Sequence, residues 1–269
     1  MSQEKSALEI KRIKAKKRKD FIAIAIFWLS LCVECYALYT KNYTVRFYSR
    51  TIMVPMLFYR IFDKEVFFSM HFFVYLTLLL SWFGDIMNLI MDFKIQYLAS
   101  AFYTLSYLVF GIVFYNFKDK KKMYVNYIFY TFFAVLGMIV FFFFYFPTLN
   151  DTLNTVHLAI HGLVLLFALI WAFVIRNDMA KIGLKYFLPA ILMMIVTNVL
   201  YALDYYIINP QYTIHYYAQR HTSVDALVAI CYGLYMFLYT QGIRYIKHAQ
   251  IIELKKDSEG DVYLKKDLK

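Results

Sequence analysis

The sequence predicts an all-α fold, a polytopic integral membrane bundle of eight transmembrane helices. Of the 269 residues, 62% are hydrophobic and 21% are aromatic, which is far above the usage of soluble domains. The chain also contains eight runs of roughly 20 residues with few charges, the length that crosses a bilayer. The formal net charge of +11 comes from basic residues in tails and short loops, so we expect membrane topology rather than nucleic-acid binding to account for it.

The eight runs define one membrane domain, residues 21–246, between a basic tail of residues 1–20 and a second basic tail of residues 247–269. We expect both tails to be cytoplasmic. In chain order, the expected spans are Phe21–Tyr39, Val45–Phe62, Val66–Ile90, Ile95–Phe117, Met123–Phe146, Asn154–Ile175, Leu184–Ile208 and Ser223–Ile246.

Each of the first four spans has a recognisable boundary or polar feature. The first follows the charged tail and carries Glu34 in its second half. The second begins with Arg46 and Arg50, one turn apart, and contains a proline. The third contains Asp85, and the fourth ends at the lysine-rich loop 118–122. Clustered basic residues of this kind mark the ends of spans.

The last four spans are delimited in the same way. The fifth is strongly aromatic and stops at Pro147, which cannot continue a helix without losing a hydrogen bond. The sixth carries His157 and His161 at its start. The seventh carries Asn198 and Asp204 towards its end, and the eighth runs into the basic tail.

The distribution of basic residues orients the bundle. Eight spans place both termini on one side, and 24 of the 29 Lys and Arg residues fall on that side. The positive-inside rule makes that side cytoplasmic, and we expect the plasma (inner) membrane of a bacterium. The five basic residues on the other side are Lys41, Arg46, Arg50, Lys94 and Arg220.

The third span carries a polar seam. On a helix, Thr77, Ser81, Asp85, Asn88 and Asp92 share one face, while apolar residues cover the others. One interpretation is that such a seam does no more than form hydrogen bonds to neighbouring helices. A carboxylate at membrane depth costs roughly 2.5–3.5 kcal/mol on insertion scales, so a chain that carries one usually uses it. We therefore expect Asp85 to line a functional site.

The topology brings polar residues of other spans to the same non-cytoplasmic depth as Asp85. We expect them to surround one cavity that opens to the outer leaflet. Arg46 and Arg50 either reach lipid headgroups or bind a phosphate group in that cavity. The other candidates for this cavity are Glu34, Asn88, Tyr107, His157, His161, Asn198, Asp204 and Asp225.

His157 and His161 lie four residues apart, a spacing that puts both imidazoles on one helix face and suits a metal ion. Further ligands would have to come from Asp85 or Asp204. Hydrogen-bonded structural histidines are the alternative interpretation and the one we favour. We expect no cofactor.

Four segments carry a family resemblance: RTIMVP at 50–55, LSWFGD at 80–85, AFYTLSY at 101–107 and VTNVLYALD at 196–204. In order and spacing they resemble the YhhN-like family of eight-span membrane proteins, which includes lysoplasmalogenases. The Ser-x-x-Gly-Asp segment that ends at Asp85 is the close match. Family members typically have His where this chain has Tyr107, and Ser-Asp where it has Thr197 and Asn198.

The resemblance implies hydrolysis of the vinyl ether of a lysoplasmalogen, a membrane lipid, to a fatty aldehyde and a glycerophospho-base. This chemistry needs a proton delivered to the alkene carbon and a water added to the resulting oxocarbenium ion. Asp85 is then the candidate general acid. Water activation falls to Asp204, Glu34 or a histidine, and Arg46 or Arg50 would hold the headgroup phosphate.

Two alternatives to this activity remain. A metal held by His157, His161 and an aspartate could activate water for attack on an amide or an ester. Alternatively, a non-catalytic lipid-binding or carrier protein could keep the cavity without any chemistry. Asn198 favours the carrier, because an amide cannot act as a general base.

Overall fold

A computed structural model of the chain describes residues 2–62, 71–90, 93–115, 162, 183–202 and 224–245. Within these residues the fold is all-helical, as predicted. The fifth and sixth expected spans, apart from residue 162, lie outside the described residues. The elements are α1 (Ser2–Tyr39), α2 (Tyr43–Ile61), α3 (His71–Leu89), α4 (Phe93–Tyr115), the π-helical turn η4 (Gly183–Phe187), α8 (Leu188–Ala202) and a further helix, Val224–Tyr245, called helix 224–245 below.

The described helices have the character of a membrane protein. Large apolar side chains point outward from the bundle, among them Phe21, Leu29 and Leu105, whereas Glu34 and Asp85 are buried. Polar groups inside and apolar groups outside are the arrangement that a bilayer requires. Among the residues that the structure describes, three helical segments are long and apolar enough to cross a membrane: Lys14–Tyr39, Phe72–Leu89 and Val224–Tyr245.

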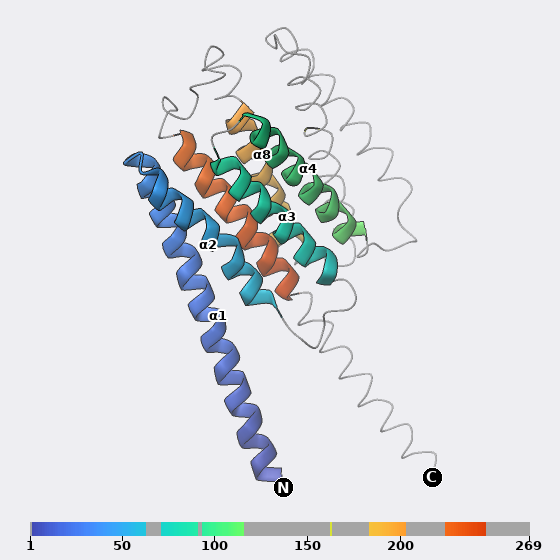
Figure 1. Cartoon of the computed structure of the whole chain (residues 1–269). Coiled ribbons are helices and arrows are strands. Elements are labelled where there is room, and N and C mark those ends of the chain that lie inside the picture. Colours follow the sequence, from blue (N-terminus) through green and yellow to red (C-terminus); the bar gives the residue numbers. More distant parts are fainter. Residues whose placement is uncertain are drawn as a thin grey trace.

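Helix α1 begins well before the first expected span. It runs without a break from Ser2 to Tyr39, so the expected basic tail is helical and continuous with the apolar segment. At 1.5 Å per residue, its 38 residues extend about 57 Å. Figure 1 shows its N-terminal part projecting beyond the ends of the neighbouring labelled helices. Ala, Lys, Arg and Glu, which are strong helix formers, are frequent in this part.

A tight turn joins α1 to α2 as an antiparallel pair. Lys41 takes a left-handed backbone conformation with a φ of 53°, and Asn42 then caps α2 by accepting a hydrogen bond from the Val45 amide at 3.1 Å. This cap starts α2 at Tyr43, two residues before the expected start. The turn is short enough that Glu34, near the end of α1, faces the first turns of α2.

The seventh expected span, Leu184–Ile208, does not begin as regular α-helix, because a π-helical turn precedes α8. Pro189 is the second residue of α8 and has no N–H to donate to the carbonyl of Lys185. The backbone there forms the π turn Gly183–Phe187 instead of regular α-helix. Pro55, by contrast, lies inside α2, which continues on both sides of it.

Helix 224–245, orange-red in Figure 1, forms much of the core. Its Phe237 ring stacks against Phe27 of α1 with ring centroids 6.0 Å apart. Its backbone comes close to other helices at two glycines, Gly233 against Leu31 and Gly242 against Phe187. A row of tyrosines on this helix, Tyr232, Tyr235 and Tyr239, packs against the α4 residues Tyr103, Tyr107 and Phe110.

A polar contact ties three helices together near the N-terminal end of the apolar part of α1. Asp20 accepts hydrogen bonds from Arg60 Nε of α2 at 2.8 Å and from Arg244 Nη1 of helix 224–245 at 2.7 Å. Asp20 precedes Glu34 by 14 residues, which is about 21 Å along the helix. This contact is therefore well separated from the site described next.

Candidate active site

Asp85 is the central residue of the candidate site and is completely buried on α3. Its Oδ1 accepts hydrogen bonds from Arg50 Nε at 2.9 Å and from the Tyr103 hydroxyl at 2.8 Å, and its Oδ2 accepts one from the Tyr232 hydroxyl at 2.8 Å. The three donors belong to α2, α4 and helix 224–245. One carboxylate therefore links four helices through hydrogen bonds to a charged group, which are stronger than neutral ones.

Glu34 of α1 supplies a second buried carboxylate. Its Oε1 accepts a hydrogen bond from Arg46 Nε at 3.2 Å and lies 3.7 Å from Arg50 Nη1. Its Oε2 accepts one from the Ser49 hydroxyl at 2.8 Å. The charges therefore alternate along Arg46, Glu34, Arg50 and Asp85, an arrangement called the charge chain below. Two cations and two anions offset one another, which limits the cost of burying them.

The sequence predicts that these four residues line one cavity. The structure brings them together on three helices as ion pairs, and only Arg46 among them lines a hollow. It also separates the two arginines. Arg50 is directed at Asp85, and its Cζ lies 5.4 Å from the centre of the Tyr232 ring. Arg46 is bound to Glu34 and also reaches a surface hollow. Of the two arginines predicted as candidates to hold a headgroup phosphate, Arg46 alone lines this hollow.

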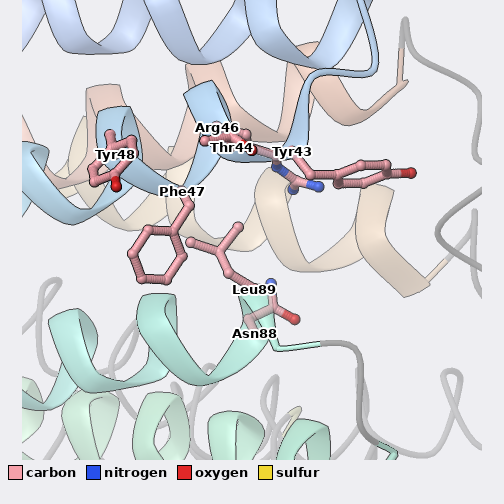
Figure 2. Close-up of a pocket in the computed structure, with 7 residues that line it drawn as sticks. All are labelled: Tyr43, Thr44, Arg46, Phe47, Tyr48, Asn88 and Leu89. Atoms are coloured by element: carbon pink, nitrogen blue, oxygen red, sulfur yellow. The ribbon is translucent and has the colours of Figure 1, made fainter.

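The hollow lies where α2 begins and α3 ends, and has a volume of about 310 Å³. Figure 2 shows Phe47 of α2 and Leu89 of α3 extending towards each other across it, with Asn88 nearby. Asn88 follows Asp85 by three residues, about 4.5 Å along the helix. The hollow thus combines one cation, several polar groups and apolar side chains. Its lining residues are Tyr43, Thr44, Arg46, Phe47, Tyr48, Asn88 and Leu89.

The polar seam of α3 is a packing surface for α4 as well as the position of Asp85. The Ser81 and Ser106 hydroxyls are 2.7 Å apart, and Ser106 donates to the carbonyl of Thr77 at 3.0 Å. At Gly84, an added Cβ would lie 2.9 Å from Cε1 of Tyr103. The absence of a side chain there lets the Tyr103 ring lie on α3 and its hydroxyl reach Asp85. Each of the three specified residues of the Ser-x-x-Gly-Asp segment, Ser81, Gly84 and Asp85, therefore makes a defined contact.

Substituting Gly84→Ala is expected to lower the free energy of unfolding by about 1–3 kcal/mol, the usual range for overpacking. The added methyl group would displace the Tyr103 ring and weaken its hydrogen bond to Asp85. Denaturation in mixed detergent micelles, followed by circular dichroism, measures the change. In a Tyr103→Ala background the same substitution should cost much less. An equal cost in both backgrounds would contradict this explanation.

Asn198 and Tyr107, two of the residues expected to line the cavity, contact each other. The Asn198 Nδ2 donates to the Tyr107 hydroxyl at 3.2 Å and to the carbonyl of Met194 at 2.7 Å. Tyr107 is buried, and its ring lies 6.4 Å from that of Tyr235. Among the described residues, no hydrogen bond joins Asn198 to Asp85. Asp204, His157 and His161 lie outside the described residues, so their predicted roles stay predictions.

The sequence argument missed three residues that contact the charge chain: Ser49, Tyr103 and Tyr232. Ser49 could have been found, because it lies three residues after Arg46 on the same helix face. For Tyr103 the indication in the sequence was weaker: a glycine directly before Asp85 leaves room for a side chain of a neighbouring helix to pack there. Tyr232 had none, since it is one of 26 tyrosines in the chain.

Comparisons with known proteins add no assignment to this site. No family model, no curated protein and no solved structure matches the chain. In the described part of the chain, no group of three or more His, Cys, Asp and Glu side chains is arranged to hold a metal ion.

Proposed function

We propose that the chain is an eight-span membrane hydrolase of the lysoplasmalogenase type, with both termini cytoplasmic and its site at the outer side of a bacterial inner membrane. The observation that carries the proposal is a buried carboxylate, Asp85, joined through alternating charges to a cation, Arg46, that lines a surface hollow. A single-chain lipid has the same two parts, a charged headgroup and a reactive linkage close to it.

The lining of the hollow supports a lipid ligand. Arg46 offers a guanidinium to a phosphate, and Thr44 and Asn88 offer neutral donors beside it. Phe47 and Leu89 supply apolar surface for the first part of a hydrocarbon chain. The hollow opens on the outside of the helix bundle, where large apolar side chains face the surroundings. A lipid could therefore reach it from the bilayer.

The chemistry requires a proton on the alkene carbon farther from the ether oxygen. Water then adds to the oxocarbenium ion, and the hemiacetal breaks down to aldehyde and alcohol. Asp85 is the proposed proton donor. Of its three hydrogen-bond donors, Arg50 and Tyr232 are buried, whereas Tyr103 is partly exposed. Tyr103 is therefore the donor that a substrate would displace first, and Asp204 is proposed to activate the water.

A non-catalytic lipid-binding role is the second candidate, and one observation favours it. Both oxygens of Asp85 already accept hydrogen bonds, and the side chain is completely buried. A carboxylate held in this way can serve purely to join helices. In that case the hollow would bind lipid and release it unchanged.

Turnover of defined lipids separates the two candidates. Purified full-length protein in detergent would be incubated with single-chain lipids that carry a vinyl ether, an ester or an amide. Formation of fatty aldehyde from the vinyl ether alone is the expected result. Binding of these lipids without any product would support the carrier, and cleavage of the ester or amide alone would contradict the vinyl-ether assignment.

Substituting Arg46→Gln is expected to weaken binding of a phosphate-bearing single-chain lipid at least about tenfold, because a charge-assisted hydrogen bond contributes about 1.5–3 kcal/mol. Affinity for a monoacylglycerol of the same chain length should change little, since it has no phosphate. Isothermal titration in detergent measures both affinities. Equal losses for the two lipids would mean that Arg46 shapes the hollow without binding the headgroup.

A further inference from the structure

We propose that Glu34 is a positioning residue that couples a phosphate in the hollow to the release of Asp85. In this scheme the phosphate draws Arg46 away from Glu34, Glu34 then attracts Arg50, and Arg50 leaves Asp85. The inference deepens the proposed function and rests on it for the role of Asp85. It explains how a carboxylate with every oxygen occupied becomes available once the right lipid has bound.

The first step follows from the position of Arg46. Its Nε is bound to Glu34 at 3.2 Å, and the same side chain lines the hollow. A guanidinium binds a phosphate through two neighbouring N–H groups of its planar fork, so a phosphate that takes the Nε–H as one of them competes directly with Glu34. Glu34 is 1% exposed and has no access to water that would replace a lost cation.

The second step follows from the way Arg50 is shared. Its Nε lies 2.9 Å from Asp85, while its Nη1 lies 3.7 Å from Glu34. The fork therefore already spans both carboxylates, with the shorter contact to Asp85. When Arg46 no longer neutralises Glu34, the attraction between Glu34 and Arg50 increases. A small rotation of the Arg50 side chain exchanges the shorter contact for the longer one.

The third step concerns Asp85 itself. Without Arg50 its remaining donors are the neutral hydroxyls of Tyr103 and Tyr232. An isolated buried carboxylate is very unfavourable and takes up a proton, which comes from the bulk solvent. Asp85 then has the proton that the proposed reaction needs. A lipid without a phosphate would occupy the hollow and leave the charge chain unchanged, so the charge chain would select for the headgroup.

Infrared difference spectroscopy of the full-length protein tests this coupling, because a protonated carboxyl group has a carbonyl band that a carboxylate lacks. The probes are lysophosphatidylcholine and a monoacylglycerol of equal chain length. Wild-type protein should gain the band with lysophosphatidylcholine and not with the monoacylglycerol. The Asp85→Asn variant assigns the band, since the signal should be absent there.

The Glu34→Gln variant should bind lysophosphatidylcholine at least as tightly as wild type and yet lose the band. Asp20→Asn is the matched control, because it makes the same change on α1 at a carboxylate that pairs with a different arginine. It should keep the band. A band that persists in Glu34→Gln, or wild-type spectra that respond equally or not at all to the two lipids, would overturn the proposal. These outcomes do not depend on turnover, so they are distinguishable from a failure of the hydrolase assignment.

Discussion

Substituting Asp85→Asn is expected to lower turnover of a vinyl-ether lysolipid by at least about 100-fold, the lower end of what a general acid contributes. An amide retains the shape of the side chain and one acceptor oxygen, but it has no acidic proton to deliver to the alkene carbon. Aldehyde release from purified protein measures the effect. Lipid binding in the hollow should persist, because Asp85 is not among the residues that line it.

Asp20→Asn provides the comparison for this experiment. It removes a carboxylate from a contact with Arg60 and Arg244 that lies far along α1, so turnover should stay close to that of wild type. Circular dichroism and gel filtration must show that both variants are folded. Unchanged turnover by a folded Asp85→Asn variant would remove Asp85 from the mechanism and leave it as a residue that joins helices.

The second large effect is on stability. Substituting Arg50→Met is expected to lower the free energy of unfolding by about 3–5 kcal/mol, the usual cost of breaking a buried ion pair by removing one partner. Methionine fills much of the same volume, so the loss reflects the unpaired carboxylates of Asp85 and Glu34 rather than a cavity. Denaturation in mixed detergent micelles provides the measurement.

Arg244→Met makes the same chemical change at a more exposed position. The Arg244 side chain is 34% exposed in its contact with Asp20, and partly exposed pairs contribute about 1 kcal/mol or less. The double variant Arg50→Met with Asp85→Asn should be less destabilised than the sum of the single variants, because the uncompensated charge is removed together with its partner. Additive losses would show that the two side chains do not interact.

The parts of the site that could be predicted are those in which a charge breaks an apolar run. Glu34, Arg46, Arg50 and Asp85 stand out in this way, and the topology placed them at one depth. The helix boundaries were also close, because charged loops and apolar runs determine them. Helix α1, for example, ends at Tyr39 as expected, and α2 ends at Ile61, one residue before the expected Phe62.

The pairing of these residues could not be predicted. The expected depth in the membrane predicts that Arg46 and Arg50 lie near two carboxylates. The rotation of α2 about its axis determines which arginine reaches the hollow and which one reaches Asp85. The contact of Tyr232 with Asp85 depends on how helix 224–245 packs against α3, and 147 residues separate the two in the chain. In an aromatic-rich chain, no local pattern marks one tyrosine among many.

The alternation of charge along Arg46, Glu34, Arg50 and Asp85 has a consequence for the electrical behaviour of the protein. A single charge that moves across a membrane potential of 100 mV gains or loses about 2.3 kcal/mol. With two guanidinium groups and two carboxylates ionised, the charge chain carries no net charge, so a voltage exerts opposing forces on its members that largely cancel. Displacement of the charge chain as a unit would therefore carry no net charge through the field, whereas in a variant that neutralises one of the four residues the same displacement would carry one.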